Sequence, residues 1–191
     1  MPDDADVPKP HNADWAWRPP LWSAPLPEPD VSVTSGRTEI CNAATLFHDA
    51  EAADIILQQR SQAKPTTAYE LGIEVGAFEG SFLSLVLDLP EAATQGLKRT
   101  HILRVTSAVT LTPPITAFVR LNVRHGPNTE QLLRQIDTES SNVQVEFDLA
   151  YSEVNDRRIE GAWIDLIFEA PARTRILLQD LTVLRRRRAP M

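Results

Sequence analysis

The 191-residue chain contains a single cysteine, Cys41. An internal disulfide, a cysteine-based zinc cluster and an iron–sulfur cluster each need more than one cysteine, so none can form within one copy of the chain. Cys41 lies in the apolar stretch EICNAATLF, which is typical of a buried, unreactive thiol. The fold must therefore depend on a hydrophobic core, for which this length is sufficient.

Long apolar runs and an excess of basic residues are also missing. No stretch of about 18 apolar residues occurs, so we expect no membrane-spanning helix. The start MPDDADVPKP is acidic and proline-rich where a secretory signal is basic and then apolar, which favours a cytoplasmic location. A net charge of −7 argues against nucleic acid as the main partner. The exception is Arg185–Arg188, interpreted as a solvated chain end, with an anionic partner as the alternative.

Familiar catalytic motifs are absent. The four histidines belong to no HExxH or HxH spacing, and the sequence has no GxSxG, GxGxxG or GxxxxGK[ST] motif. The acids near His48, in FHDAEAAD, are interpreted as ordinary turn residues and not as a metal site. We therefore expect no cofactor, no bound metal and no catalytic activity.

Prolines and tryptophans gather in residues 1–30, which hold eight of the 15 prolines and three of the four tryptophans. This composition predicts an extended arm preceding a domain that spans residues 31–191. Trp15, Trp17 and Trp22 carry too much apolar surface to remain in water. The arm either covers an open face of its own domain or binds a protein partner through these three tryptophans.

From about residue 31 onward, apolar and polar residues alternate with a period of two, which predicts β-strands. The expected strands cover residues 31–35, 69–78, 81–89, 101–107, 115–125, 142–151, 162–170 and 175–184. So many strands in one domain favour a mainly antiparallel, all-β sandwich of the jelly-roll or galactose-binding-like type, with a few short helices.

The stretch NVQVEFDL gives the clearest alternation, because Val143, Val145, Phe147 and Leu149 would face inward and the residues between them outward. Helix is expected in HGPNTEQLLRQI, residues 125–136, where a cap and an apolar face follow a turn. One further helical turn is expected in each of residues 90–97 and 153–160, and residues 48–59 remain ambiguous between helix and strand.

The strand FVRLNVRH displays the most promising polar side chains. If Val119, Leu121 and Val123 face the core, then Arg120, Asn122 and Arg124 share the other face, and His125 follows at the turn. One interpretation is that the two arginines form surface ion pairs with Glu146 and Asp148 on a neighbouring strand.

The alternative is a ligand-binding face for a sugar, since sugars are held by planar polar groups and an aromatic plate. Arg120, Asn122, Arg124 and His125, with Glu146, Asp148 and either Trp163 or Tyr151, would supply these parts. A third hypothesis uses Glu146, Asp148 and Asp165 as paired carboxylates of a glycan hydrolase or lyase.

Several phrases of the sequence resemble an uncharacterised bacterial family, a domain of unknown function. They are GSFLSLVLDLP (80–90), FVRLNVRHGPNTEQL (118–132), VEFDLAYSEVNDRRIEGAWIDLIFE (145–169) and LLQDLTVLRRRRA (177–189). This resemblance implies no activity for any residue. The ending AWIDLIFEAPARTRILLQDLTVLRR also resembles the last strands of galactose-binding-like sandwiches, the architecture of many carbohydrate-binding modules, which raises the expectation of glycan binding.

The sequence therefore predicts a non-catalytic β-sandwich that acts by binding, first of all as an interaction protein whose arm seals the fold or engages a partner. Carbohydrate recognition on the Arg120, Asn122 and Arg124 face is the alternative function, and a jelly-roll glycan hydrolase or lyase is the second alternative.

Overall fold

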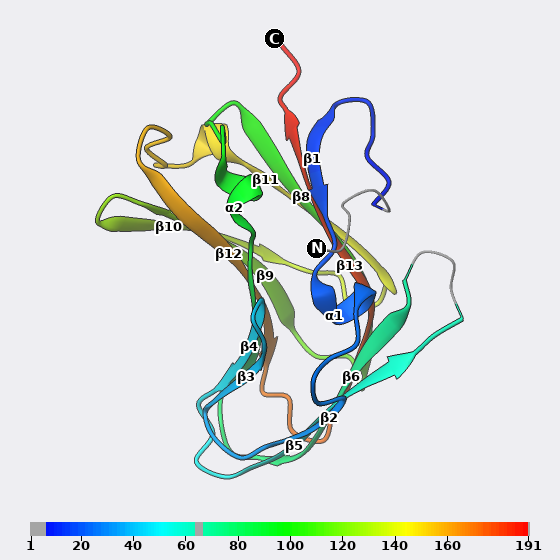
Figure 1. The fold of residues 1–191 in the computed structure, drawn as a ribbon. Helices are drawn as coiled ribbons and strands as arrows, with labels where there is room; N and C mark the ends of the chain where they lie inside the picture. The colour runs from blue at the N-terminus through cyan, green and yellow to red at the C-terminus, as the bar shows by residue number, and fades with distance from the viewer. Residues whose placement is uncertain (1–6, 64–66, 191) are drawn as a thin grey trace.

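The structure is a computed structural model that describes residues 7–63 and 67–190. Two antiparallel sheets pack face to face as a β-sandwich, which confirms the expected fold class (Figure 1). Short helices α1 (Pro20–Ser23), α2 (Glu91–Thr94) and the 3₁₀ turn Leu149–Tyr151 complete the described chain. Among these residues, no helix has the length and apolar character needed to cross a membrane.

The first sheet has seven strands. Its order is β11 (Asn142–Asp148), β8 (His101–Thr112), β13 (Arg175–Arg187), β6 (Tyr69–Phe78), β5 (Ala53–Ser61) and β2 (Asp30–Val33), with β1 (Ala13–Trp17) paired to β13. The second sheet has six strands. Its order is β10 (Asn128–Gln135), β9 (Ala117–His125), β12 (Ile159–Glu169), β7 (Phe82–Asp88), β4 (Ala44–His48) and β3 (Arg37–Cys41).

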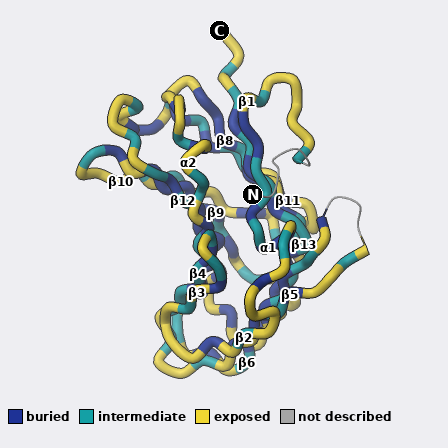
Figure 2. The backbone as a smooth tube through the Cα atoms, in the orientation of Figure 1, coloured by how far each residue is buried: buried dark blue, intermediate teal, exposed yellow. Residues whose placement is uncertain are grey.

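The core lies between the sheets and is built by alternation along each strand. Strand β11 follows the predicted alternation at Val143 and Phe147, which are buried, and at Asn142 and Gln144, which are exposed, while Val145, Glu146 and Asp148 are half-buried. Leu149 is also buried, but it lies in the 3₁₀ turn that follows the strand. Figure 2 shows this pattern along the whole backbone, with buried stretches in the strands and exposed loops at the ends. The alternation therefore fixes which face of each sheet remains available to ligands.

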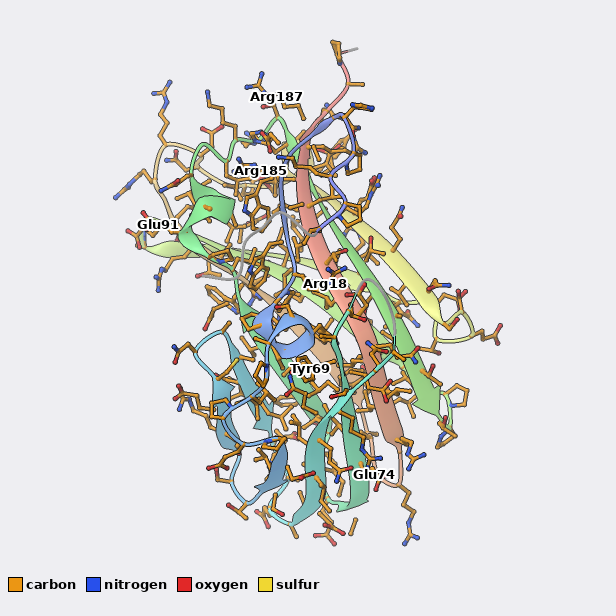
Figure 3. All side chains as sticks on the ribbon, turned by 45° about the vertical axis from the view of Figure 1, so that its right-hand side comes forward. Arg18, Tyr69, Glu74, Glu91, Arg185 and Arg187 are labelled. Carbon is orange, nitrogen blue, oxygen red and sulfur yellow. The ribbon has the colours of Figure 1, made fainter. Side chains whose placement is uncertain are left out.

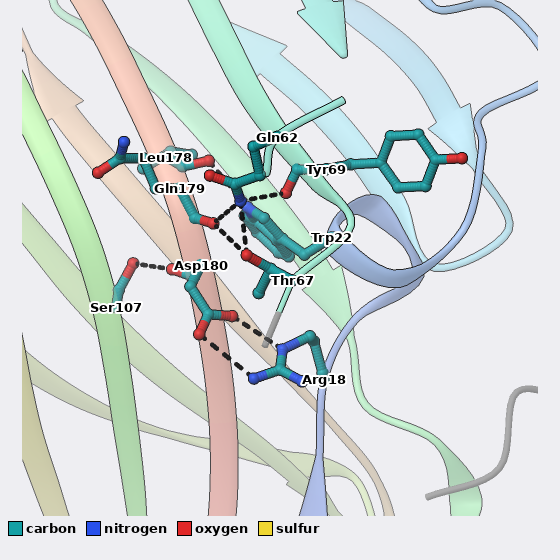
Figure 4. A network of polar contacts seen from close by, with 9 residues as sticks. All are labelled: Arg18, Trp22, Gln62, Thr67, Tyr69, Ser107, Leu178, Gln179 and Asp180. Atoms are coloured by element: carbon teal, nitrogen blue, oxygen red, sulfur yellow. Dashed lines mark hydrogen bonds and ion pairs between the residues drawn. The ribbon is translucent and has the colours of Figure 1, made fainter. Parts of the chain in front are cut away.

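The N-terminal arm packs on its own domain. Trp15 and Trp22 are members of the hydrophobic core, and Trp17 is half-buried beside them. The Trp22 indole Nε1 donates a hydrogen bond of 2.9 Å to the Leu178 carbonyl, and Arg18 forms an ion pair of 2.9 Å with Asp180 (Figure 4). The two buried tryptophans are thus engaged within the fold, so they offer a protein partner no anchor in this structure.

The stretch expected to be helical after residue 127 is a strand. Residues Asn128–Gln135 form β10, which pairs with β9 from Asn128 opposite His125 to Gln135 opposite Phe118. A two-residue loop joins the strands, and Gly126 adopts a φ of 56° there, as a tight hairpin requires. Hairpin pairing therefore outweighs the local capping pattern.

The arginine run is also not a solvated chain end, because β13 extends through Arg187. Arg185 is buried and forms an ion pair of 2.8 Å with Asp14, and Arg186 and Arg188 lie 3.1 Å and 2.8 Å from carboxylates of β11. Only Arg187 of the four is exposed.

Candidate ligand-binding site on the open face of the six-stranded sheet

The outward side chains of β9 and β12 lie opposite one another across the ladder. Asn122 is in register with Trp163, and Arg120 with Asp165. Their inward neighbours Val119, Leu121, Ile164 and Leu166 are buried in the core. The alternation of both strands therefore brings an arginine, an amide, a carboxylate and an indole to one small area of the open face.

This area is hollowed. A hollow of about 380 Å³ has polar walls from Arg120, Asn122 and Asp165, and the exposed Gln131 of β10 lies beside them. Its size is that of a small-ligand site, and it combines apolar and polar side chains as such sites do.

The polar side chains of the hollow are joined in one network. The Arg120 guanidinium Nε donates a hydrogen bond of 2.7 Å to Asp165 Oδ2, and the Asn122 amide donates one of 3.0 Å to the same oxygen. Gln131 Nε2 in turn donates to Asn122 Oδ1 at 3.0 Å. Asp165 is only 2% exposed, so its charge is held in place by these donors. The network fixes planar polar groups before any ligand arrives.

Strand β7 adds two polar side chains, those of Ser84 and Asp88, that form no hydrogen bond with the described residues. The Ser84 hydroxyl is buried and has no hydrogen-bond partner among the described residues. Burial raises the pKa of Asp88, and the negative charge of nearby Asp165 raises it further. Both residues line the hollow, with Ser84 buried in its wall and Asp88 exposed.

Aromatic side chains border the hollow. Trp163 lies on β12, while Phe47 on β4 and Phe82 on β7 lie farther along the face, and all three are half-buried. The Arg37 guanidinium is 5.8 Å from the centre of the Phe47 ring. Half-buried rings next to fixed polar groups are a combination that suits a sugar ring, which has one apolar side and a rim of hydroxyl groups.

Two of the predicted site residues lie on the same strand but outside the hollow. Arg124 forms an exposed ion pair of 3.4 Å with Glu160. His125 is buried, and its Nδ1 accepts a hydrogen bond of 3.1 Å from the Asn155 backbone N–H. His125 therefore has a structural contact in the loop, and it does not line the hollow.

The predicted pairing of β9 with β11 is wrong. Strand β11 belongs to the other sheet, where it pairs with β8, so Glu146 and Asp148 cannot meet Arg120 and Arg124. Asp148 pairs with Arg188, and Glu146 contacts Arg104 at 2.6 Å and Arg186 at 3.1 Å. Burial raises the pKa of Glu146, but its hydrogen bonds to Arg104 and Arg186 outweigh this and lower the pKa overall.

The same separation rules out the carboxylate trio, since Asp165 lies on the six-stranded sheet and the other two acids on the seven-stranded sheet. Within residues 7–63 and 67–190, no group of three or more histidine, cysteine and acidic side chains has the geometry to hold a metal.

Several residues of the hollow escaped the sequence analysis. The strand predicted over residues 162–170 already placed Asp165 on the face of Trp163, but the partner strand was not identifiable. Ser84 and Asp88 lie in a mostly apolar stretch, so the sequence did not indicate which of its residues face outward. Gln131 lies in the segment that was predicted to be a helix. Phe47 lies in β4, a segment that was not among the predicted strands.

A family model matches the whole chain, residues 1–191. The chain belongs to DUF6478, a family of unknown function. No curated protein matches this DUF6478 member.

Two solved structures share the fold of this DUF6478 member. One is the family 11 carbohydrate-binding module of Clostridium thermocellum in complex with a β-1,3-1,4-mixed-linked tetrasaccharide. Its TM-score is 0.50 and its sequence identity 10%, and the match covers 81% of this chain and 94% of that chain. The other is the enzymatically active domain of tailspike protein 4 of bacteriophage CBA120, with a TM-score of 0.52 and 9% identity over 80% of this chain and 21% of that chain. At such identities the likeness shows a common β-sandwich and no shared activity.

Proposed function

We propose that this DUF6478 member binds an oligosaccharide in the hollow of the six-stranded sheet and does not cleave it. The observation that carries the proposal is the pre-formed Arg120–Asp165–Asn122 network, in which Asp165 and Asn122 are buried and Arg120 is partly exposed, with Trp163 beside it. The fold shared with a carbohydrate-binding module supports it. The arm is a weaker candidate for binding because its large apolar side chains are engaged in the core.

The chemistry of the hollow suits neutral sugars better than charged ones. Arg120 and Asp165 neutralise each other at 2.7 Å, so the pair offers hydrogen bonds without a net charge, and the Asp88 carboxylate in the same hollow would repel an anionic sugar. Gln131 retains hydrogen-bond acceptors and donors that are not engaged, and the Ser84 hydroxyl forms no hydrogen bond with the described residues. Trp163 would stack on the apolar side of a sugar ring.

Binding without turnover follows from how Asp165 is held. Oδ2 of this carboxylate already accepts hydrogen bonds from Arg120 and Asn122, and the residue is almost fully buried. A catalytic base or nucleophile must reach the anomeric carbon or a water molecule, and its function is weakened when its charge is committed to neighbours.

The proposal is tested by a glycan array followed by calorimetric titration of the strongest neutral oligosaccharide. Trp163→Ala and Gln131→Ala should each weaken binding roughly tenfold or more, because each removes an accessible side chain that lines the hollow. Arg124→Ala is the matched control, since Arg124 is on the same strand but outside the hollow, and it should bind as the wild type does. An array with no binding, or wild-type affinity in both hollow variants, would defeat the proposal.

A further inference from the structure

One outer edge of the six-stranded sheet has no partner strand. Strand β10 pairs with β9 along one side, and within residues 7–63 and 67–190 no strand pairs with its other side. It lies at the outer margin of the molecule in Figure 1 and, with side chains drawn, in Figure 3. The backbone N–H and C=O groups of such an edge can pair with a strand of another chain.

Alternate residues of β10 present these backbone groups to the outside. The Ile136 N–H, just beyond the strand, donates to the Ala117 carbonyl, so the even-numbered residues are the ones that bond to β9. The groups that point away from the sheet therefore belong to the odd-numbered residues, which are Thr129, Gln131, Leu133 and Gln135. The Leu133 carbonyl accepts a hydrogen bond of 2.9 Å from the exposed Arg134 side chain and has a second lone pair available.

Strand β10 differs from the other edge strands in being long, regular and unprotected. It has eight residues, contains neither proline nor lysine, and keeps its register with β9 from Asn128 to Gln135 without a bulge. The opposite edge of the same sheet, β3, has a register shift between Glu39 and Cys41. The order of the seven-stranded sheet ends in β2, which has four residues, and in β11, which carries two acids and no basic residue.

The sequence of β10 is complementary to itself in an antiparallel pair. When the pair is centred on Leu132, every outward-pointing residue meets an outward-pointing residue of a second copy, so all of their backbone groups are satisfied. The same register places Glu130 opposite Arg134 of the second copy, and the two-fold symmetry makes this contact twice. Centring the pair on Gln131 or Leu133 breaks both charge pairs and leaves a residue unpaired at each end.

Glu130 and Arg134 lie on the same side of β10, the side that Leu132 turns toward the core. Glu130 Oε1 accepts a hydrogen bond of 3.1 Å from the Glu153 backbone N–H, which leaves Oε2 unengaged by the described residues. The Arg134 guanidinium is exposed and lies 5.5 Å from the centre of the Phe147 ring. In the proposed register the two side chains occupy a non-hydrogen-bonded pair, where cross-strand side chains are closest.

Pairing at this edge also covers apolar surface. Leu133 is 49% exposed on the open face of the sheet. In the centred pair it stands diagonally across from Leu133 of the second copy, within reach of a long side chain. The half-buried Leu132 meets its own counterpart on the core side. Both contacts remove apolar side-chain surface from water.

We propose that β10 is a dimerisation strand, through which two copies of this chain pair edge to edge and join their six-stranded sheets into one continuous sheet. The two-fold axis is perpendicular to the sheet, so both hollows open on the same side of the dimer. The dimer does not rest on glycan binding, and either proposal can fail without the other.

The test is sedimentation velocity of the full chain from about 1 to about 200 µM, where a modest interface gives a monomer–dimer equilibrium. Glu130→Arg and Arg134→Glu each place like charges opposite one another at two positions, so each should weaken dimerisation at least tenfold. Glu39→Arg is the matched control, because it makes the same reversal at an exposed position on the opposite edge strand, and it should dimerise as the wild type does.

A mixture of the two variants separates pairing from folding. Equal amounts of the Glu130→Arg and Arg134→Glu proteins restore opposite charges at both positions, so dimers should form again in the mixture. Leu133→Lys, at an exposed position, provides a further variant and should also weaken dimerisation, because it brings two lysines together.

The proposal is overturned if the wild type stays monomeric over the whole range of concentration. It is also overturned if the charge-reversed variants dimerise as the wild type does, or if their mixture stays monomeric while both unfold at the wild-type urea midpoint. Dimers that Glu39→Arg weakens as much as Glu130→Arg does would likewise contradict pairing through β10.

Discussion

Asp165 shows how one buried carboxylate can organise the surface that we propose binds a glycan. A charge with 2% exposure is tolerated only when it is paired and hydrogen-bonded, and Arg120 and Asn122 provide both. The pairing also fixes the two donors, so their geometry does not depend on a ligand. The site is therefore pre-formed at the level of single side chains.

His101 is a second buried titratable group, with 2% exposure. Its Nδ1 accepts a hydrogen bond of 2.9 Å from the Lys98 backbone N–H, and its Nε2 lies 3.2 Å from Asp14. Burial lowers the pKa of His101 most, Asp14 opposes this, and the positive charges of Arg185 and Arg187 lower it further. The folded protein therefore keeps this imidazole neutral at a pH where the unfolded chain protonates it.

The sign of the resulting pH dependence follows from this shift. Stability from the neutral His101 is fully present above its ordinary pKa of 6.5 and is lost as the pH falls toward the lower, folded value. Between about pH 7.5 and about pH 5.5, the free energy of unfolding should fall in the wild type and fall less in His101→Gln. Urea unfolding at several pH values measures both slopes, and equal slopes would show that His101 does not contribute.

At the scale of elements, the arm is a structural part of the sandwich. The buried Gln59 side chain on β5 donates to the carbonyls of Leu21 and Ala24 at 2.9 and 2.7 Å and accepts from the Leu26 N–H at 2.8 Å. These bonds satisfy backbone groups of a proline-rich segment that no sheet ladder could satisfy. Trp22 fills the core beneath this segment.

Trp22→Ala should therefore lower the free energy of unfolding by about 3–5 kcal/mol, because it leaves a large cavity in the core. Trp17→Ala is the matched control from the same arm, and it should cost less because Trp17 is only half-buried. Urea unfolding of both variants measures the difference. An equal loss in the two variants would mean that the arm does not dock as described.

Strands β10 and β11 show what sequence alone could and could not predict. In β11 the alternation of Val143 and Phe147 with polar residues identifies the buried face without knowledge of the partner strand. In β10 the run around Leu132 and Leu133 fits helical spacing equally well, and only pairing with β9 decides for a strand. Alternation within a strand was enough to place Arg120, Asn122 and Trp163 on an outward face. It could not show that Glu146 belongs to the other sheet, because the order of strands depends on contacts between residues distant in the sequence.

At the scale of the whole molecule, both sheets have an outer face with hollows, but the two faces differ in chemistry. The seven-stranded sheet has hollows of about 330 and 180 Å³, and many of their lining side chains are charged or aliphatic. Glu74 and Arg175, which form an ion pair, line both hollows, and no aromatic side chain is among the described residues that line them. The six-stranded sheet carries Trp163 and Phe47 beside a fixed polar network. Glycan binding is therefore expected on the six-stranded sheet only.

The most direct measurement is a ¹⁵N NMR titration of the full chain with the oligosaccharide that binds most tightly on the array. Saturable shifts of the Trp163 indole N–H and of backbone amides in β9 and β12 are expected, with little change in β5, β6 and β13. Shifts confined to the outer face of the seven-stranded sheet, or no saturable shift at Trp163, would contradict it.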